Sequence, residues 1–139
     1  MFKKILVPTD LTKKNKKALD IAVKIALHYK GTVYLLHVIE TIAHTSFDEL
    51  EDFYRNLEKR AKKYMDKLLT PYQKSKVPLE CKITFGNRLQ EILRFASTNK
   101  SDLIVLNSHK LNLKNHTANW GTISYKVGIL SQCPVMLVK

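Results

Sequence analysis

The sequence predicts an α/β fold, a single doubly wound domain in which four helices cover a five-stranded parallel sheet. Short apolar segments with the composition of buried strands alternate along the whole chain with longer segments of helical periodicity. A helical segment separates each pair of successive strands, and parallel pairing requires such a connection. The 139 residues contain no linker, repeat or low-complexity segment, and this length matches one domain.

The five predicted strands are short apolar runs bounded by turn residues. The fourth is apolar throughout, which is typical of a strand buried on both faces. The third alternates apolar with polar residues, so we expect it to be half-exposed and near an edge of the sheet. The predicted strands are Phe2–Val7, Thr32–Val38, Leu79–Phe85, Leu103–Leu106 and Val135–Val138.

The first helix is predicted over Lys13–Lys30, where apolar residues recur at helical spacing. We expect Thr12 to cap its N-terminus through the side-chain oxygen. We expect Gly31 to end it in the left-handed conformation, which glycine adopts at little cost.

The second predicted helix is long and begins at a capping box formed by Ser46 and Glu49. Pro71 ends it. A regular apolar stripe predicts the face that packs on the core, and the aromatic content of the stripe leaves a ligand groove as the alternative. The stripe consists of Phe47, Leu50, Phe53, Tyr54, Leu57, Ala61, Tyr64, Met65 and Leu68.

Two shorter helices complete the pattern. The third follows Gly86, and the fourth is predicted over Gly121–Leu130. The apolar face of the third consists of Leu89, Ile92, Leu93 and Ala96.

The composition, with 45% hydrophobic and 26% charged residues, is that of a soluble globular protein. No apolar run is long enough to span a bilayer, and the basic N-terminus reaches Pro8 too soon for a secretory signal. Cys81 and Cys133 lack metal-ligand spacing, so we expect two reduced thiols and a cytoplasmic location.

The net charge of +12 raises the question of a nucleic-acid partner. The lysines are spread over predicted helix faces and loops rather than gathered into one arm. Arginine, the more usual reader of bases, is the minority cation. A solvated basic surface is therefore the favoured interpretation, and we expect neither a nucleic-acid nor a membrane partner.

The segment Ser101–Thr122 is where we first look for a ligand. It leads from a buried strand through a polar loop to a helix start, and ligands of parallel sheets bind beyond the carboxyl ends of strands. A helix start also offers unpaired N–H groups to an anion. His109 and His116 share this loop, but no carboxylate or thiol lies beside them, so we expect no metal site. Asp10, after the first strand, either caps a turn or accepts a hydrogen bond from a ribose hydroxyl or a base amine.

Five short motifs occur in a characteristic order along the chain. They are Lys4–Asp10, Leu36–Val38, Gly86, Asp102–Val105 leading into Ser108-His109, and Cys133–Val135. With these motifs the chain resembles the universal stress protein family over essentially its whole length. The resemblance implies an adenine nucleotide alpha hydrolase-like fold and a homodimer joined along the last strand.

Many members of that family bind ATP, and the resemblance maps their nucleotide site onto this chain. The binding members carry a glycine, two residues, a second glycine, nine residues, and then Gly-Ser or Gly-Thr. By resemblance the phosphate side falls on Asn107, Lys110, Gly121 and Thr122, and the adenosine side falls on Pro8, Thr9, Asp10 and Val38.

This chain replaces the first two of those glycines, and its segment 111–120 is one residue longer than the family spacer. Asn107 tolerates the left-handed conformation, whereas Lys110 does not and adds a side chain where phosphate would lie. The ammonium of Lys110 can replace part of the lost amide contacts. Trp120 either stacks on a base or, as we favour, anchors the loop to the sheet. We therefore expect weakened adenine nucleotide binding.

The sequence thus predicts a cytoplasmic, dimeric stress-response regulatory module that binds ATP or another adenine nucleotide in the crevice after the first and fourth strands. Two alternatives stay open: a stress protein that acts through protein partners without nucleotide, and a slow ATP hydrolase. The chain carries no phosphate-loop, dinucleotide, hydrolase-elbow or zinc-protease motif, and no catalytic residue is predicted. The hydrolase alternative lacks a general base near the loop, because Asp10 falls on the adenosine side.

Overall fold

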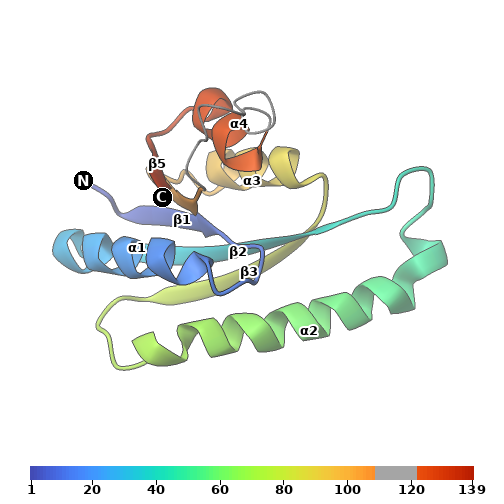
Figure 1. Ribbon diagram of the computed structural model, residues 1–139, viewed down its shortest axis with the longest axis horizontal. Coiled ribbons are helices and arrows are strands. Elements are labelled where there is room, and N and C mark those ends of the chain that lie inside the picture. Colours follow the sequence, from blue (N-terminus) through green and yellow to red (C-terminus); the bar gives the residue numbers. More distant parts are fainter. Residues whose placement is uncertain (109–121) are drawn as a thin grey trace, which may run out of the picture.

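The computed structural model describes residues 1–108 and 122–139 (Figure 1). In this part of the chain, five parallel strands form one sheet in the order β3-β2-β1-β4-β5. The strands are β1 (Lys4–Pro8), β2 (Thr32–Glu40), β3 (Leu79–Gly86), β4 (Leu103–Asn107) and β5 (Val135–Val138). The predicted fold class is confirmed, and β3 lies at an edge as expected, with most of its residues partly exposed.

Four α-helices of the described chain cover the two faces of the sheet (Figure 1). They are α1 (Asn15–Tyr29), α2 (Glu51–Leu69), α3 (Arg88–Thr98) and α4 (Ile123–Leu130), and two 3-10 turns, η1 (Asp48–Leu50) and η2 (Thr70–Tyr72), flank α2. Alternate residues of β1 point to opposite faces, so Ile5 and Val7 pack with α1 while Leu6 packs with α3 and α4. Each face of the sheet therefore has its own apolar core.

The N-terminus of α1 differs from the prediction. The helix begins at Asn15, and Lys14 at the cap position makes no side-chain capping bond. Thr12 instead donates its hydroxyl to Asp10 Oδ1, and its carbonyl accepts from the Asn15 amide. The prediction that Thr12 caps the helix is wrong, because α1 begins at Asn15 with Lys14 at the cap position, and the Thr12 side chain lies against Asp10 instead.

The C-terminus of α1 also differs from the prediction. Lys30, not Gly31, takes the left-handed conformation, with φ of 57°. Gly31 is required for another reason, since a Cβ there would lie 2.4 Å from the carbonyl oxygen of Phe2. The glycine thus permits a close approach of two backbone segments rather than a positive φ.

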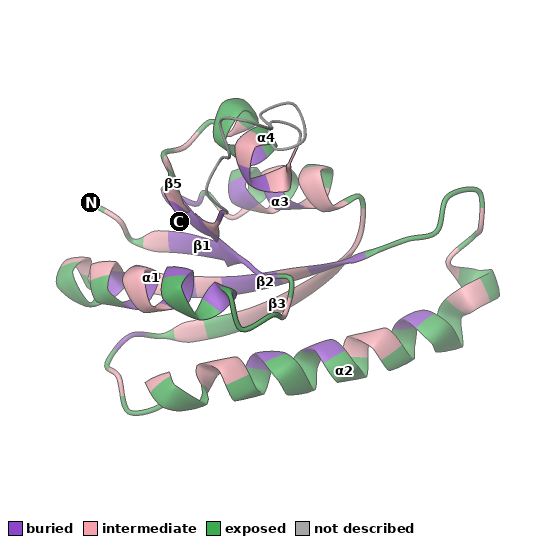
Figure 2. Cartoon of the chain, in the orientation of Figure 1, coloured by how far each residue is buried: buried purple, intermediate pink, exposed green. Residues whose placement is uncertain are grey.

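The start of α2 is only partly as predicted. Ser46 Oγ accepts a hydrogen bond from the Glu49 amide at 3.3 Å, but that bond opens the η1 turn, and α2 itself begins at Glu51. The helix is long and mostly exposed on its outer side (Figure 2).

The predicted core stripe of α2 is wrong at two positions. Phe53 and Tyr64 are 48% and 55% exposed, whereas their neighbours Tyr54 and Met65 are fully buried. Adjacent residues lie about 100° apart around a helix, and only one of each pair can face the sheet.

The fourth helix begins two residues later than predicted, at Ile123, with Thr122 at its cap position. Gly121, the predicted start, lies outside the described residues. Within the described residues, no helix combines the length and the apolar character that crossing a membrane requires.

Candidate functional site

A pocket of about 330 Å³ opens at the carboxyl ends of β1, β2 and β4. The chain leaves β1 for β2 on one side and later returns to β4 on the other, so the pocket lies at the point where the strand order reverses. Its lining is Pro8, Thr9, Asp10, Asn15, Leu36, Val38, Arg88, Ile92, Leu106, Asn107, Thr122, Ile123 and Ser124.

Six of the eight residues predicted for the nucleotide site line this one pocket, although they are far apart in the sequence. They are Pro8, Thr9, Asp10, Val38, Asn107 and Thr122. The other two, Lys110 and Gly121, lie outside the described residues, as do His109, His116 and Trp120. The assignment of these residues to a ligand stays a prediction.

Asp10 holds the turn between β1 and α1 with one carboxylate oxygen. Its Oδ1 accepts from the amide and hydroxyl of Thr12, at 3.0 and 2.7 Å, and from the side-chain amide of Asn15. Burial alone would raise the pKa of this carboxyl, but these hydrogen bonds, with the charge of Arg88, lower the pKa below its ordinary value. Asp10 is therefore an anion at neutral pH, and no described residue donates to its Oδ2.

Asn15, the first residue of α1, is a polar residue of the lining that was not predicted from the sequence. It is 4% exposed, and its amide nitrogen faces the acceptors Asp10 Oδ1 and the Thr12 carbonyl. This orientation leaves Oδ1 of Asn15 without a partner among the described residues. A sequence signal was present, since Asn15 is the one residue without a positive charge in the run from Lys13 to Lys17.

Arg88 is the second missed residue, and it comes from the first turn of α3. Asn87 caps that helix by accepting from the Gln90 amide at 3.0 Å, which fixes where Arg88 leaves the backbone. The guanidinium lies 3.5 Å from Glu40, with both side chains about half-exposed. Exposed ion pairs of this kind contribute only about 0–1 kcal/mol to stability. The Arg88 side chain can therefore leave Glu40 and contact a ligand instead.

The side of the pocket near β4 and α4 is lined by hydroxyls. Ser124 Oγ lies 3.3 Å from Thr122 Oγ1 and donates to Ser108 Oγ at 3.1 Å. Ser108 directly follows Asn107, the last residue of β4. Hydroxyls and a helix start are groups that bind phosphate oxygens.

His37 supports the pocket from the opposite face of β2. Its Nδ1 lies 2.9 Å from the carbonyl oxygen of Thr9, and since a carbonyl only accepts, Nδ1–H is the donor. Burial lowers the pKa of His37 below its ordinary value, so the ring is neutral at pH 7. This bond holds His37 against the backbone at the end of β1, which gives the ring a structural role.

A larger hollow, of about 410 Å³, lies near the opposite edge of the sheet between the ends of α3 and α4. Its described lining shares no residue with the predicted nucleotide site and includes one charged side chain, Lys100. The carboxyl-edge pocket carries charges of both signs, Asp10 and Arg88, beside uncharged polar groups, and it is the better candidate.

Comparison with known proteins identifies the family. A statistical model of the universal stress protein family matches residues 1–139. The chain belongs to that family. It is 28% identical to universal stress protein YxiE of Bacillus subtilis (strain 168) over 150 residues, with all of both chains covered. It is 26% identical to universal stress protein MJ0531 of Methanocaldococcus jannaschii, with all of this chain and 83% of that protein covered.

Solved structures of family members share the fold. Universal stress protein UspA from Lactobacillus plantarum superposes with a TM-score of 0.82 at 24% identity, covering 99% of this chain and 98% of that one. The hypothetical protein MJ0577 superposes with a TM-score of 0.77 at 31% identity, covering 100% of this chain and 96% of that one.

Two further structural neighbours were solved with nucleotides. One is a universal stress protein in complex with cAMP, at a TM-score of 0.69 and 18% identity, covering 99% of this chain and 97% of that one. The other is the universal stress protein from Archaeoglobus fulgidus in complex with dAMP. It has a TM-score of 0.71 and 17% identity, and covers 99% of this chain and 98% of that one. At these identities the likeness establishes a common fold.

Proposed function

We propose that the protein is a cytoplasmic stress-response regulatory module that binds ATP or another adenine nucleotide in the carboxyl-edge pocket. The observation that carries the proposal is the convergence of the six predicted residues on one pocket at the switch point of the sheet. The complexes of structural neighbours with cAMP and dAMP support the choice of ligand class.

The lining suggests how the nucleotide lies. Val38 and Ile92 offer an apolar wall to the base, and both are buried within the core between the sheet and α3. The free Oδ2 of Asp10 accepts from a ribose hydroxyl. Thr122 and the start of α4 then face the first phosphate. A helix start contributes about 0.3–1 kcal/mol when exposed, so we expect modest affinity.

Isothermal titration calorimetry tests the proposal. The wild-type protein should give heat with millimolar ATP, and Asp10→Ala should weaken binding about tenfold, because it removes a charged acceptor. Val38→Trp should abolish binding by filling the pocket. Asp48→Asn, which replaces an exposed carboxylate in η1 by an amide, serves as the control. No heat from wild type would favour the alternative in which the protein acts through protein partners.

We also propose that two copies pair through β5. This strand is at the edge of the sheet, and an exposed apolar edge invites pairing with another chain. Met136 on β5 is 38% exposed, and Ile129 and Leu130 at the end of the neighbouring α4 are 78% and 55% exposed. A two-fold dimer across this edge would cover all three.

Slow ATP hydrolysis is the weaker alternative. Asp10 is the one carboxylate in the described lining, and the proposed binding mode uses it for the ribose. A general base must reach the water that attacks the phosphate. We therefore expect phosphate release from ATP at the rate of a protein-free blank.

A further inference from the structure

Asn15 is a deeply buried polar residue with one hydrogen-bonding atom unused. It is 4% exposed, and it lines the pocket from the first turn of α1. Buried polar groups are nearly always satisfied, because a hydrogen bond left unmade inside a protein costs free energy. A buried side chain that keeps a spare acceptor beside a pocket therefore indicates a ligand that donates to it.

The neighbours of Asn15 determine which of its atoms is spare. Its side-chain nitrogen donates to Asp10 Oδ1 and, at 3.2 Å, to the carbonyl oxygen of Thr12. A carboxylate and a carbonyl only accept, so the NH₂ group has to face them and the amide cannot be turned round. The carbonyl oxygen of the side chain, Oδ1, then has no partner among the residues that the structure describes. Unlike the unpaired hydroxyl of Ser101, this oxygen is not enclosed by protein.

A second spare acceptor belongs to the side chain that Asn15 contacts. Asp10 Oδ1 accepts from the Asn15 side chain and from the amide and hydroxyl of Thr12, and no described residue donates to Oδ2. Asp10 is exposed, so a ligand can reach this second oxygen. The Asn15 amide and the Thr12 hydroxyl have thus spent their donors, while two oxygens of adjoining side chains stay open. We call Asn15 Oδ1 and Asp10 Oδ2 the acceptor pair.

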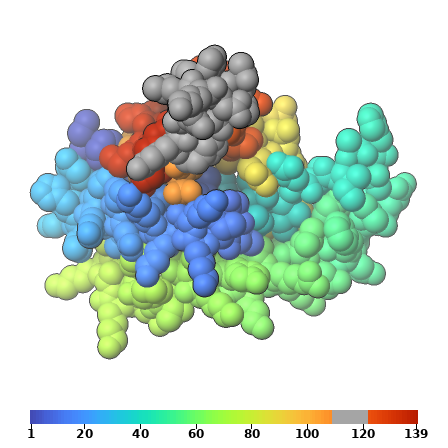
Figure 3. Space-filling model, in the orientation of Figure 1, coloured from blue at the N-terminus to red at the C-terminus, as the bar shows by residue number. Residues whose placement is uncertain are grey.

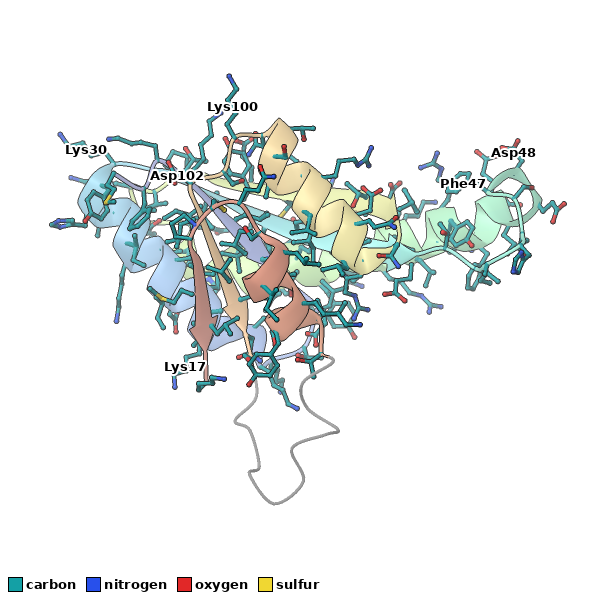
Figure 4. All side chains as sticks on the ribbon, turned by 90° about the horizontal axis from the view of Figure 1, so that it is seen from above. Lys17, Lys30, Phe47, Asp48, Lys100 and Asp102 are labelled. Atoms are coloured by element: carbon teal, nitrogen blue, oxygen red, sulfur yellow. The ribbon has the colours of Figure 1, made fainter. Side chains whose placement is uncertain are left out.

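The figures place the acceptor pair at the carboxyl edge of the sheet. Figure 4 shows Lys17, two residues after Asn15, at the end of the molecule toward which the strands run, and Lys30 at the opposite end. In Figure 3 the medium-blue start of α1 lies on the same face as the orange end of β4, which lines another side of the pocket. A ligand in the pocket can therefore meet the acceptor pair with one of its parts and the start of α4 with another.

Two neighbouring acceptors suit a ligand group that offers two neighbouring donors. A phosphate does not suit them, because its charged oxygens would be repelled by the carboxylate of Asp10. In an adenine nucleotide the ribose carries hydroxyls on two adjacent carbons, each able to donate, whereas the base carries a single amino group. The 2′,3′-diol of the ribose is therefore the part of the ligand that matches the acceptor pair.

We propose that Asn15 and Asp10 together bind the free 2′,3′-diol of a ribose, so that the pocket selects ribonucleotides over their 2′-deoxy and 3′-deoxy analogues. The inference rests on the proposed function and adds Asn15 as a specificity-determining residue. A deoxy analogue leaves one of the two acceptors unpaired, and a site built to bond a hydroxyl discriminates against a ligand that lacks it. Selection thus depends on the sugar rather than on the number of phosphates.

Isothermal titration of the full chain with four ligands tests the inference. The ligands are AMP, 2′-deoxy-AMP, 3′-deoxy-AMP and IMP, in which an oxygen replaces the amino group of the base. Wild type should bind AMP about fivefold more tightly than either deoxy ligand, which is the size of one lost hydrogen bond. This measurement needs no variant, so it stands even where a substitution prevents folding.

Two variants then separate Asn15 from the rest of the pocket. Asn15→Ala removes one acceptor, so the preference for AMP over one of the two deoxy ligands should disappear. The preference over the other deoxy ligand and the ratio of AMP to IMP affinity should stay as in wild type. Asn56→Ala makes the same change at an exposed position of α2 and should bind all four ligands as wild type does. Thermal unfolding shows whether each variant is folded.

Three results would overturn the inference while nucleotide binding, and with it the proposed function, remains. The first is equal affinity of wild type for AMP and both deoxy ligands. The second is an Asn15→Ala variant that weakens all four ligands by the same factor, as a purely structural role would. The third is a changed ratio of AMP to IMP affinity with unaltered sugar selectivity, which would assign Asn15 to the base. Failure of all four ligands to bind wild type would overturn the proposed function itself.

Discussion

At the scale of single residues, Asp10 has a structural role, and the proposed function gives it a ligand-binding role as well. One oxygen organises the turn into α1, and the other has no described partner beside the pocket. Sequence reasoning left a capping role and a ligand role open as alternatives. The sequence shows hydroxyls and amides near this carboxylate, but it does not show which of the two carboxylate oxygens accepts their hydrogen bonds. The structure makes the two roles compatible.

This arrangement predicts how stability depends on pH. Asp10→Asn should lower the free energy of unfolding at pH 7 by about 1 kcal/mol, because hydrogen bonds to a charged acceptor are stronger than those to a neutral one by about that amount. Because the folded-state pKa is below the ordinary 3.8, the contribution of the charge is present above 3.8 and is lost as pH falls through the folded value. The stabilities of wild type and variant, measured by urea unfolding, should therefore converge as the pH falls below 3.8. A difference that does not shrink as the pH falls below 3.8 would contradict the prediction.

Two glycines offer a matched pair of substitutions. Gly31→Ala should destabilise the protein by about 1–3 kcal/mol, because the new methyl group meets the Phe2 carbonyl and the backbone must shift. Gly128→Ala should instead stabilise by up to about 1 kcal/mol, since Gly128 lies inside α4 and its new Cβ meets only Leu137 Cδ1 at 3.9 Å. Thermal unfolding measures both. Equal effects of the two would refute the close-approach explanation of Gly31.

At the scale of elements, α2 shows where sequence periodicity reaches its limit. The spacing of apolar residues identified the helix correctly, but it assigned both members of two adjacent pairs to the core. Burial follows which residue lies over the sheet, and that depends on the tertiary position of the helix. Tyr54 is fixed by contacts that the sequence does not reveal, a stacked ring of Phe47 and an edge-on ring of Phe85.

The α2 assignment is testable by truncation of neighbouring rings. Tyr54→Ala should cost about 3–5 kcal/mol, the range for large buried aromatic residues, and it also removes the hydroxyl that accepts from the Ile42 amide at 2.8 Å. Phe53→Ala should change stability by less than about 0.5 kcal/mol, as at an ordinary surface position. Urea unfolding at pH 7 compares the two variants. A large cost at Phe53 would mean that this ring is covered, for example by a second copy.

At the scale of the whole molecule, the fold was largely predictable and the site was predictable in part. Apolar runs and helix spacing suffice for the sheet because alternation of strands and helices leaves few ways to bury both faces. The carboxyl ends of β1 and β4 then locate the pocket. Asn15 and Arg88 were missed because residues in the first turn of a helix are read as helix surface, and only the packing of α1 and α3 brings them to the pocket.

The dimer proposal belongs to this scale. Sedimentation equilibrium at micromolar concentration should show wild type as a dimer and Met136→Glu as a monomer, because the new charge would be buried at the interface. Ile42→Glu is the matched control, since Ile42 is 51% exposed and lies in the loop after β2. Monomeric wild type would contradict pairing through β5.

The position of the pocket between the two helical layers has a consequence for dynamics. Its lining takes Asn15 from α1 on one side of the sheet and Thr122 at the start of α4 on the other. An occupant that contacts both would tie together elements whose apolar cores are otherwise separate. Amide hydrogen exchange would then slow in both layers at once, so a single small molecule would stiffen the entire carboxyl edge rather than one loop.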